Sequence, residues 1–531
     1  MEVSETRASM QPPEIFEPPL SEGGALSENE IKFEEFRQRA GFILAPVIFL
    51  ALWFLPIPGL EDKIVAHHLL AILGLVVTLW ISEAIPLAAT ALLGPALCVV
   101  FAIAPAKDIF KSFADPIIFL FIGSFLLAEG IYHHGLNRRI AFQILSLKII
   151  GNSPTRLMLA FGCITAVFSM WISNTTTVAM MLPVGVSILS EMARRRSPQL
   201  GREVKYTDLK FGTGLMLIMM FAATVGGIAT PVGTPPNLIA IGLIEKNAGV
   251  QIPFFKWMTF GLPLAFLMMT FLVIYLRRLF PGETDLLGES SHWILAEKAK
   301  CGLLSRGEKN VLIAFGFTVT LWLVPGICAL ILGANHEVSR FFSTRFPEST
   351  VALLGALLLF LLPINFRQRH FTLTWTEAKR IDWGTILLFG GGLALGDQMF
   401  STGLAHWLGT GLVEVTHAHT TAGLVVLFSV IAAFMTQGAS NTASTAMVVP
   451  VAIAVSQAAG VNPLQPALAT GICAALGCML PVSTPPNAIA YGSGSIPLMQ
   501  MIKHGFVLTV VGIILTDAMV LWLVPLIFSG N

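Results

Sequence analysis

The chain has 531 residues, of which 55% are hydrophobic and only 12% are charged, and its formal net charge is +1. Soluble domains carry about 25% charged residues, so this composition predicts an all-α polytopic membrane protein. The near-neutral charge offers no basic patch for nucleic acid, and six scattered cysteines favour neither a disulfide framework nor a metal centre.

Residues 1–40 are polar and acidic and contain no apolar core. They predict a disordered cytoplasmic tail rather than a signal peptide. A membrane-spanning helix needs about 20 apolar residues. Eleven predicted spans lie at residues 42–60, 68–86, 87–104, 114–131, 209–229, 257–279, 308–332, 350–364, 384–399, 465–480 and 505–529.

Two further apolar stretches, residues 154–192 and 420–457, fit poorly as single crossings. Each has a polar string at its centre, Ser-Asn-Thr-Thr-Thr over 173–177 and Ser-Asn-Thr-Ala-Ser over 440–444. The string leaves two arms of about 15 residues, which are too short to cross at about 1.5 Å per residue. The pattern predicts two re-entrant hairpins with polar tips near the middle of the membrane.

A second string is also repeated. Thr-Pro-Pro-Asn occurs at 234–237 and at 484–487, inside apolar segments. Because proline cannot continue a helix, residues 209–247 and 465–498 are each expected to form a broken helix. Breaks in hydrocarbon are tolerated where the freed backbone lines a protected cavity, which favours a site built from all four strings.

The two halves of the chain align. Phe121–Glu129 matches Phe389–Asp397 at an offset of 268, the hairpin tips match at 267, and the Thr-Pro-Pro-Asn strings match at 250. This alignment predicts a first membrane repeat over 41–279, a cytoplasmic linker over 280–307 and a second repeat over 308–531.

The charges of the loops orient these repeats. With the N-terminus inside, the predicted inside segments hold 25 of the 32 Lys and Arg residues, as the positive-inside rule requires. The two hairpins then start from opposite faces, so the repeats are inverted. An odd number of spans places the C-terminus outside the cytoplasm.

Each tip offers two kinds of chemistry. The first arm ends in free carbonyls, which with Ser, Thr and Asn oxygens suit a small alkali cation; the second arm begins with free N–H groups, which suit a carboxylate. Asn174 and Asn441 carry both an acceptor and a donor, so each could contact a cation and an anion. No Lys or Arg lies in the tips or in the Pro-containing breaks at 230–237 and 481–487. A dianion at membrane depth needs positive charge, so Na⁺ from solution is its expected source.

Other function classes receive less support. The sequence has no G-x-x-x-x-G-K-[ST] string for an ATP-driven pump, and Ala394–Asp397 lacks the first glycine of a G-x-G-D protease motif, so no enzyme is predicted. A channel stays open, although inverted broken-helix repeats fit alternating access better. Four acids within or near the spans could relay protons, or could cap helices or lie at the interface: Glu83, Glu129, Asp397 and Asp517.

At these strings the chain resembles the divalent-anion:sodium symporter family, whose members carry dicarboxylates, citrate or sulfate. The resemblance covers nearly everything from residue 42 to 529. It implies a homodimer with a static scaffold domain and a mobile transport domain. The transport domain would contain both hairpins and both broken helices, and would carry the site across the membrane like an elevator.

The resemblance also implies site residues. One sodium site would be formed by Ser169, Ser173, Asn174 and the carbonyl of Gly233. The second would be formed by Thr436, the carbonyl of Ala439, Asn441 and Ser483. The substrate carboxylates would contact Asn174, Thr175, Thr234, Asn441, Thr442, Thr484 and Pro485.

The sequence therefore predicts a secondary transporter of a plasma or bacterial inner membrane. It would couple uptake of a C4-dicarboxylate (succinate, malate or fumarate) to Na⁺, and would need no organic cofactor. A Na⁺-independent exchanger of dicarboxylate or citrate and a sulfate symporter are the alternatives, because Thr234 and Ser483 lie where small residues vary among relatives.

Overall fold

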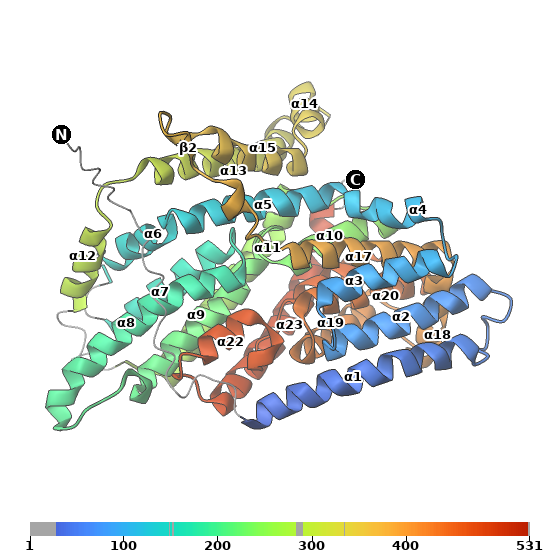
Figure 1. The fold of residues 1–531 in the computed structure, drawn as a ribbon, viewed down its shortest axis with the longest axis horizontal. Helices are drawn as coiled ribbons and strands as arrows, with labels where there is room; N and C mark the ends of the chain where they lie inside the picture. The colour runs from blue at the N-terminus through green and yellow to red at the C-terminus, as the bar shows by residue number, and fades with distance from the viewer. Residues whose placement is uncertain (1–27, 148, 151–152, 283–289, 334, 529–531) are drawn as a thin grey trace, which may run out of the picture.

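The computed structural model describes residues 28–147, 149–150, 153–282, 290–333 and 335–528. This part of the chain is mostly helical (Figure 1), as the composition predicted. Its one small sheet pairs β1 (Pro363–Asn365) with β2 (His370–Phe371) in an antiparallel hairpin. The first 27 residues of the predicted tail lie outside the described residues. Residues 28–40 correct that prediction, because they form the start of a helix.

In the described residues of its first half, the chain forms eleven α-helices and two short 3₁₀ turns. They are α1 (Glu28–Phe54), α2 (Ile64–Ser82), α3 (Leu87–Val100), α4 (Ala106–Phe110), η1 (Lys111–Ala114), α5 (Pro116–His133), α6 (Leu136–Leu145), α7 (Pro154–Ser169), α8 (Asn174–Leu200), α9 (Lys210–Ile228), α10 (Pro235–Ala248) and α11 (Phe254–Leu279), with the short turn η2 (Tyr206–Asp208) before α9.

The second half repeats this order after the linker helix α12 (Ser290–Lys300). Its helices are α13 (Arg306–Leu332), α14 (Glu337–Arg345), α15 (Glu348–Leu361), α16 (Trp375–Ala378), α17 (Trp383–Ser401), α18 (Leu404–Thr416), α19 (Thr421–Gly438), α20 (Asn441–Ala458), α21 (Leu464–Ala474), η4 (Pro481–Ser483), α22 (Pro485–Tyr491) and α23 (Leu498–Phe528).

Every predicted span overlaps a helix, but the count of eleven crossings is not reproduced. Nine helices in the described part are long and apolar enough to cross a membrane, or ten if the bent pair α14 and α15 is one span. Helices α3 and α21 are shorter, and the first-hairpin helix α8 and the second-hairpin helix α19 meet the length requirement themselves. Length alone therefore does not separate a spanning helix from a hairpin arm here.

The predicted breaks are present, with two differences in extent. Helix α7 ends at Ser169 and α8 begins at Asn174, while α19 ends at Gly438 and α20 begins at Asn441. The second arm of the first hairpin is longer than predicted, because α8 continues through the basic segment to Leu200. The break between α21 and α22 also begins earlier than the Thr-Pro-Pro-Asn string, directly after Ala474.

Helix packing relates the two halves. Helix α7 packs on α9 as α19 packs on α21, and α5 packs on α15 as α17 packs on α3. The broken helices are exchanged between the halves, since α8 contacts α22 and α20 contacts α10. One close approach recurs as well: a Cβ added at Gly123 would lie 2.5 Å from the carbonyl carbon of Ala352, and one at Gly391 would lie 2.2 Å from the carbonyl oxygen of Ala91. Contacts exchanged in this way indicate two structurally equivalent repeats.

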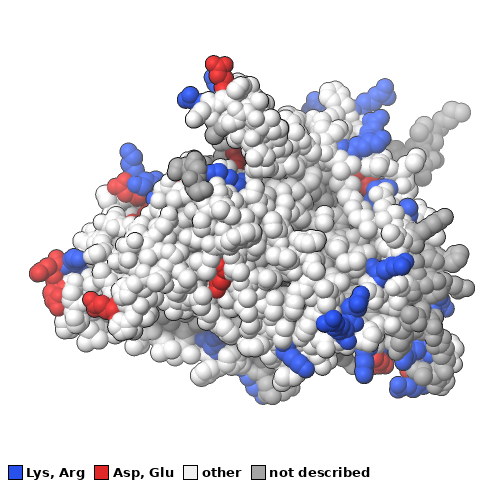
Figure 2. All heavy atoms as spheres, turned by 180° about the vertical axis from the view of Figure 1, so that it is seen from behind, with Lys and Arg blue, Asp and Glu red and all other residues white. Residues whose placement is uncertain are grey.

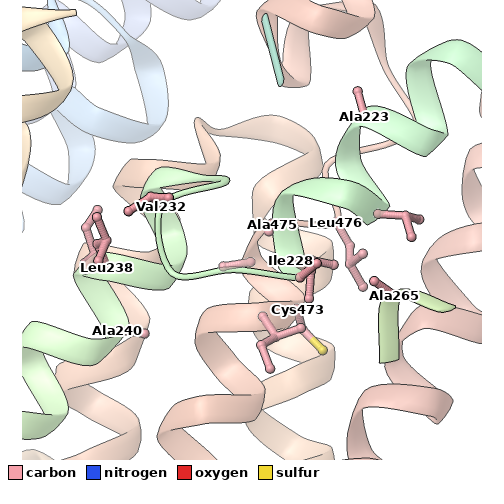
Figure 3. Close-up of a cluster of buried hydrophobic side chains, with 14 of the residues drawn as sticks. Ala223, Ile228, Val232, Leu238, Ala240, Ala265, Cys473, Ala475 and Leu476 are labelled. Carbon is pink, nitrogen blue, oxygen red and sulfur yellow. The ribbon is translucent and has the colours of Figure 1, made fainter. Parts of the chain in front are cut away.

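The core lies where the broken helices meet. Residues 211–228 of α9 are buried on every side, as are all residues 466–474 of α21. Figure 3 shows part of this cluster, in which small side chains such as Ala223, Ala240 and Ala475 are frequent. Small residues let apolar helices approach closely, which is the main source of helix association in lipid.

Charge is concentrated away from this core. In Figure 2 most visible Lys and Arg side chains gather toward one end of the molecule, which in Figure 1 carries α6, α12 and the end of α8. The linker helix α12 is docked there, with Arg138 Nη2 donating to Glu297 Oε2 at 2.8 Å. Burial raises the pKa of Glu297, but the Lys300 ammonium and the Arg138 guanidinium outweigh it and hold that pKa below its ordinary value.

Candidate functional site

Four helix breaks open onto one cavity of about 1110 Å³. Helices α8, α10, α20 and α22 all begin at its wall, and α7, α9, α19 and α21 end directly before the four breaks. The cavity therefore faces the free N–H groups at the starts of four helices. All seven residues predicted to contact substrate line it: Asn174, Thr175, Thr234, Asn441, Thr442, Thr484 and Pro485.

The first hairpin tip is closed by its own polar side chains. Ser173 is the N-cap of α8, and its Oγ accepts a hydrogen bond from the backbone N–H of Thr176 at 3.3 Å. Ser169 Oγ donates to Asn174 Oδ1 at 2.7 Å. Gly233 lies beside them, since a Cβ there would be 2.9 Å from the Ser169 carbonyl oxygen. The four residues predicted for the first sodium site are thus brought together.

The second tip has the same arrangement with different residues. Thr436 Oγ1 donates to Asn441 Oδ1 at 2.5 Å, and Asn441 Nδ2 donates to the Ala475 carbonyl at 3.1 Å. Ala439 is the C-cap of α19 and is buried. Ser483 Oγ donates to the carbonyl of Gln437 at 2.7 Å. The four residues predicted for the second sodium site also form one cluster.

Two glycines that the sequence analysis did not single out leave room for the two amides. A Cβ at Gly227 would lie 2.5 Å from Asn174 Oδ1, and a Cβ at Gly477 would lie 2.4 Å from Asn441 Oδ1. Only glycine leaves room for the amide in either half. The signal for them was available, because the two glycines differ by the same offset of 250 as the Thr-Pro-Pro-Asn strings.

The last residue of each Thr-Pro-Pro-Asn string braces its own break. Asn237 Nδ2 donates to the carbonyls of Gly227 and Thr230 at 2.9 and 2.8 Å. Asn487 Nδ2 donates to those of Gly477 and Leu480 at 2.8 and 2.9 Å. These amides satisfy carbonyls that the interrupted helices leave free, so each break has a fixed shape.

The tips contain no cationic side chain, as predicted, but two arginines line the same cavity. Arg37 from α1 donates to the Gly438 carbonyl at 2.9 Å and to Glu34 at 2.6 Å, with Glu83 at 3.5 Å. Arg380 is exposed. Glu34, Glu83, Glu129 and Asp382 line the cavity as well, so carboxylates outnumber guanidinium groups there. The charge of Arg37 is already balanced by its glutamates.

The structure shows the surroundings of all four acids considered as proton relays. Asp397 accepts a hydrogen bond from Ser112 at 2.8 Å and forms an ion pair with Lys246, which also donates to Ser112 at 3.0 Å. Glu83 is the αL C-cap of α2, with a φ of 49°, and Glu129 lines the cavity. Asp517 is buried away from the cavity and accepts from Ser429 at 2.6 Å.

The donor set fits Na⁺. Each cluster offers hydroxyl, amide and backbone oxygens, which are neutral and hard, at the carbonyl ends of interrupted helices. Helix N-termini from the same breaks face the cavity, where an anion would bind. A bundle of membrane-crossing helices that encloses such a site is a membrane transporter.

Comparison with known proteins shows the family of transporters to which the chain belongs. Residues 37–529 match the model of the family described as sodium:sulfate symporter transmembrane region, so the chain belongs to this divalent-anion:sodium symporter family. The family consists of transporters and not enzymes. The resemblance seen in the motifs is therefore confirmed.

Individual relatives agree. The chain is 33% identical over 508 residues to the sodium-dependent dicarboxylate transporter SdcS of Staphylococcus saprophyticus, with 94% of each chain covered. It is 34% identical over 495 residues to SdcS of Staphylococcus aureus, covering 93% of this chain and 92% of that one. Its fold is similar to the crystal structure of the YdaH transporter of Alcanivorax borkumensis (TM-score 0.51, 11% identity, 80% of this chain and 88% of that one).

Proposed function

We propose that this protein is a secondary active transporter that couples the uptake of a C4-dicarboxylate, such as succinate, malate or fumarate, to Na⁺. The observation that carries the proposal is the meeting of two equivalent neutral clusters, one from each repeat, at a single cavity. Two clusters suit a substrate with two carboxylates. The similarity to sodium-dependent dicarboxylate transporters supports the same substrate class.

The substrate is held by neutral donors. One carboxylate would contact Asn174, Thr175 and Thr234, and the other would contact the equivalent residues Asn441, Thr442, Thr484 and Pro485. Helix N-termini add partial positive charge to each end. Full compensation of two negative charges comes from Na⁺ at the two predicted clusters, because Arg37 is bound to glutamates.

Transport would follow an elevator mechanism in a homodimer. Helices α7–α11 and α19–α23 pack mainly on one another, while α1–α3, α5, α13, α15 and α17 form a second group. The first group contains both hairpins and both broken helices and would be the moving domain. The exchanged contacts between the repeats support an inverted repeat, which would present the same site to either face in turn.

The charge distribution orients the protein in a cell membrane. The positive-inside rule places the Lys- and Arg-rich end in the cytoplasm, with the N-terminus inside and the C-terminus outside. The cavity wall includes the start of α1, the α2–α3 turn and the start of α17, all of which the charge rule would assign to the cytoplasmic side. The conformation described here would therefore be open to the cytoplasm.

The test is uptake of radiolabelled succinate into proteoliposomes with an inward Na⁺ gradient, compared with an equal K⁺ gradient. We expect accumulation with Na⁺ alone. Uptake that ignores Na⁺ but requires internal dicarboxylate would establish an exchanger instead. Inhibition of the labelled uptake by unlabelled citrate or sulfate, at concentrations where unlabelled succinate does not inhibit it, would favour that anion as the substrate.

A further inference from the structure

We propose a third Na⁺ site inside the transport domain, formed by Asp517 of α23, Ser429 of α19 and Thr516 of α23. This inference rests on the proposed Na⁺ coupling and extends it to a location outside the substrate cavity, since none of these residues lines that cavity. Helices α19, α21 and α23 pack on one another at this point.

The carboxylate is the first reason. Asp517 is buried within a long apolar helix, and Ser429 Oγ donates to its Oδ1 at 2.6 Å. Among the described residues, no cationic side chain forms an ion pair with Asp517 or contributes to its electrostatic environment. A buried carboxylate without a partner is costly, so ionisable groups in membrane helices normally mark a functional path or a bound ion.

The hydroxyls are the second reason. Buried threonines in these helices donate to the carbonyl four residues earlier, as Thr165, Thr445 and Thr470 do. Thr516 Oγ1 is fully buried and makes no such bond to a backbone carbonyl in the described part of the chain, so its polar neighbour is the Cys473 thiol. It faces the Cys473 thiol together with Ser429 and Asp517. Because a thiol is only a weak hydrogen-bonding group, this hydroxyl oxygen is available to bind a cation beside the carboxylate.

The other repeat supplies the third reason. At the repeat offset of 267 the residue equivalent to Ser429 is Gly162, and a Cβ added there would lie 2.6 Å from Cε of the buried Met269 on α11. The first repeat thus packs this helix contact with a methionine where the second repeat has the acid, so folding does not require a polar group there. The polar cluster is an addition to the second repeat alone.

Na⁺ suits this cluster because it offers one carboxylate and two hydroxyl oxygens, a hard donor set with a single negative charge. Ser429 lies seven residues before Thr436 on α19, which is two turns and about 10 Å from the second tip. An ion bound here would move with the transport domain and would add one charge to each cycle.

The number of Na⁺ ions coupled to each succinate is the decisive measurement. In proteoliposomes with a tenfold Na⁺ gradient and a clamped membrane potential of zero, each coupled Na⁺ multiplies the attainable succinate ratio by the Na⁺ ratio. We expect Asp517→Asn to lower that ratio about tenfold relative to the wild type. Thr470→Val, which removes a satisfied buried hydroxyl nearby, is the matched control and should keep the wild-type ratio.

Three outcomes would overturn the inference. One is an unchanged ratio in folded Asp517→Asn, which would make the acid structural. Another is that Asp517→Asn keeps the number of coupled Na⁺ ions but loses a response to a pH gradient, which would make Asp517 a proton site. If Asp517→Asn does not fold, Thr516→Val tests the site with the carboxylate intact. It should raise the Na⁺ concentration for half-maximal uptake at least about fivefold over that of Thr470→Val. Equal Na⁺ concentrations in these two variants would be the third contradicting outcome. Failure of the wild type to respond to Na⁺ would instead defeat the proposed function itself.

Discussion

The two hairpin tips are closed by the same kind of hydrogen bond but are supported by different residues. Both close on an asparagine amide oxygen that accepts from a hydroxyl five residues earlier, and both are flanked by a glycine that leaves room for the amide. They differ in the residue directly after that hydroxyl. The first repeat has Met170, whereas the second has Gln437, whose Nε2 donates to the Leu476 carbonyl at 2.8 Å and whose Oε1 accepts from the Met479 N–H at 2.9 Å.

The difference follows from the lengths of the breaks. Helix α9 ends at Ile228 and α10 begins at Pro235, whereas α21 ends at Ala474 and α22 begins only at Pro485. The longer break frees more backbone groups in a buried region, and each must find a partner. The Gln437 amide supplies two of these partners. The chemistry shared by both tips is therefore the candidate site, and the unshared residues are supports.

The largest effect is expected from the shared asparagines. Asn174→Ala or Asn441→Ala removes an amide that closes a sodium cluster and faces the substrate, so Na⁺-driven succinate uptake should fall at least about 100-fold while the protein still folds. Size-exclusion profiles and thermal melts check folding. Asn462→Ala, at an exposed asparagine outside the cavity, is the control. Wild-type rates in either cavity variant would remove that amide from the site.

The shared glycines come next. In Gly227→Ala or Gly477→Ala the new methyl group would lie about 2.5 Å from the neighbouring amide oxygen and would displace it. The Na⁺ concentration for half-maximal uptake should rise about 10- to 100-fold. Gly411→Ala, at a helical position with nothing within 4 Å, is the matched control and should bind Na⁺ normally. Equal Na⁺ dependence in all three variants would show that the amides need no fixed position.

Gln437, which has no counterpart in the first repeat, should affect stability more than transport. Gln437→Met installs the residue of the first repeat. It leaves the buried Met479 N–H unpaired and leaves the Leu476 carbonyl with only the 3.3 Å bond from the Thr509 hydroxyl, which costs about 1–3 kcal/mol. Thermal unfolding in detergent measures the loss. Met170→Gln is the reciprocal variant, for which no equivalent gain is expected because the shorter break has no matching pair of free groups. A neutral Gln437→Met would contradict the role assigned to the longer break.

Much of this comparison was accessible from the sequence, because repetition marked it. The Ser-Asn-Thr and Thr-Pro-Pro-Asn strings located all four breaks, and every residue predicted for the substrate lines the cavity. Apolar length also placed the helices. What repetition could not show was where helices end in detail, since the basic residues after 192 continue α8 and the N-terminal acidic segment continues into α1.

The sequence analysis missed Gln437 and Arg37 for a physical reason. Gln437 and Arg37 have no counterpart at the equivalent position of the other repeat, and their partners lie 39 and 401 residues away along the chain. Such contacts depend on how helices pack in three dimensions. Asp397 shows the same limit: the sequence was compatible with a proton relay, a helix cap or an interfacial position, and only packing brought Lys246 to it as an ion-pair partner.

That ion pair gives the smallest predicted effect, and it tests the division into two domains. Lys246 ends α10 of the proposed moving group, whereas Asp397 lies on α17 of the scaffold group, and neither lines the cavity. Breaking it with Lys246→Met should weaken the described conformation by about 1 kcal/mol, roughly a fivefold shift in population. The measurement is accessibility of a single cysteine placed at the cavity wall, expected to fall in the variant. Lys256→Met, on α11 without an ion pair among the described residues, is the control. If the two variants label equally fast, Lys246 and Asp397 move together, and the boundary between scaffold and moving domain must be drawn elsewhere.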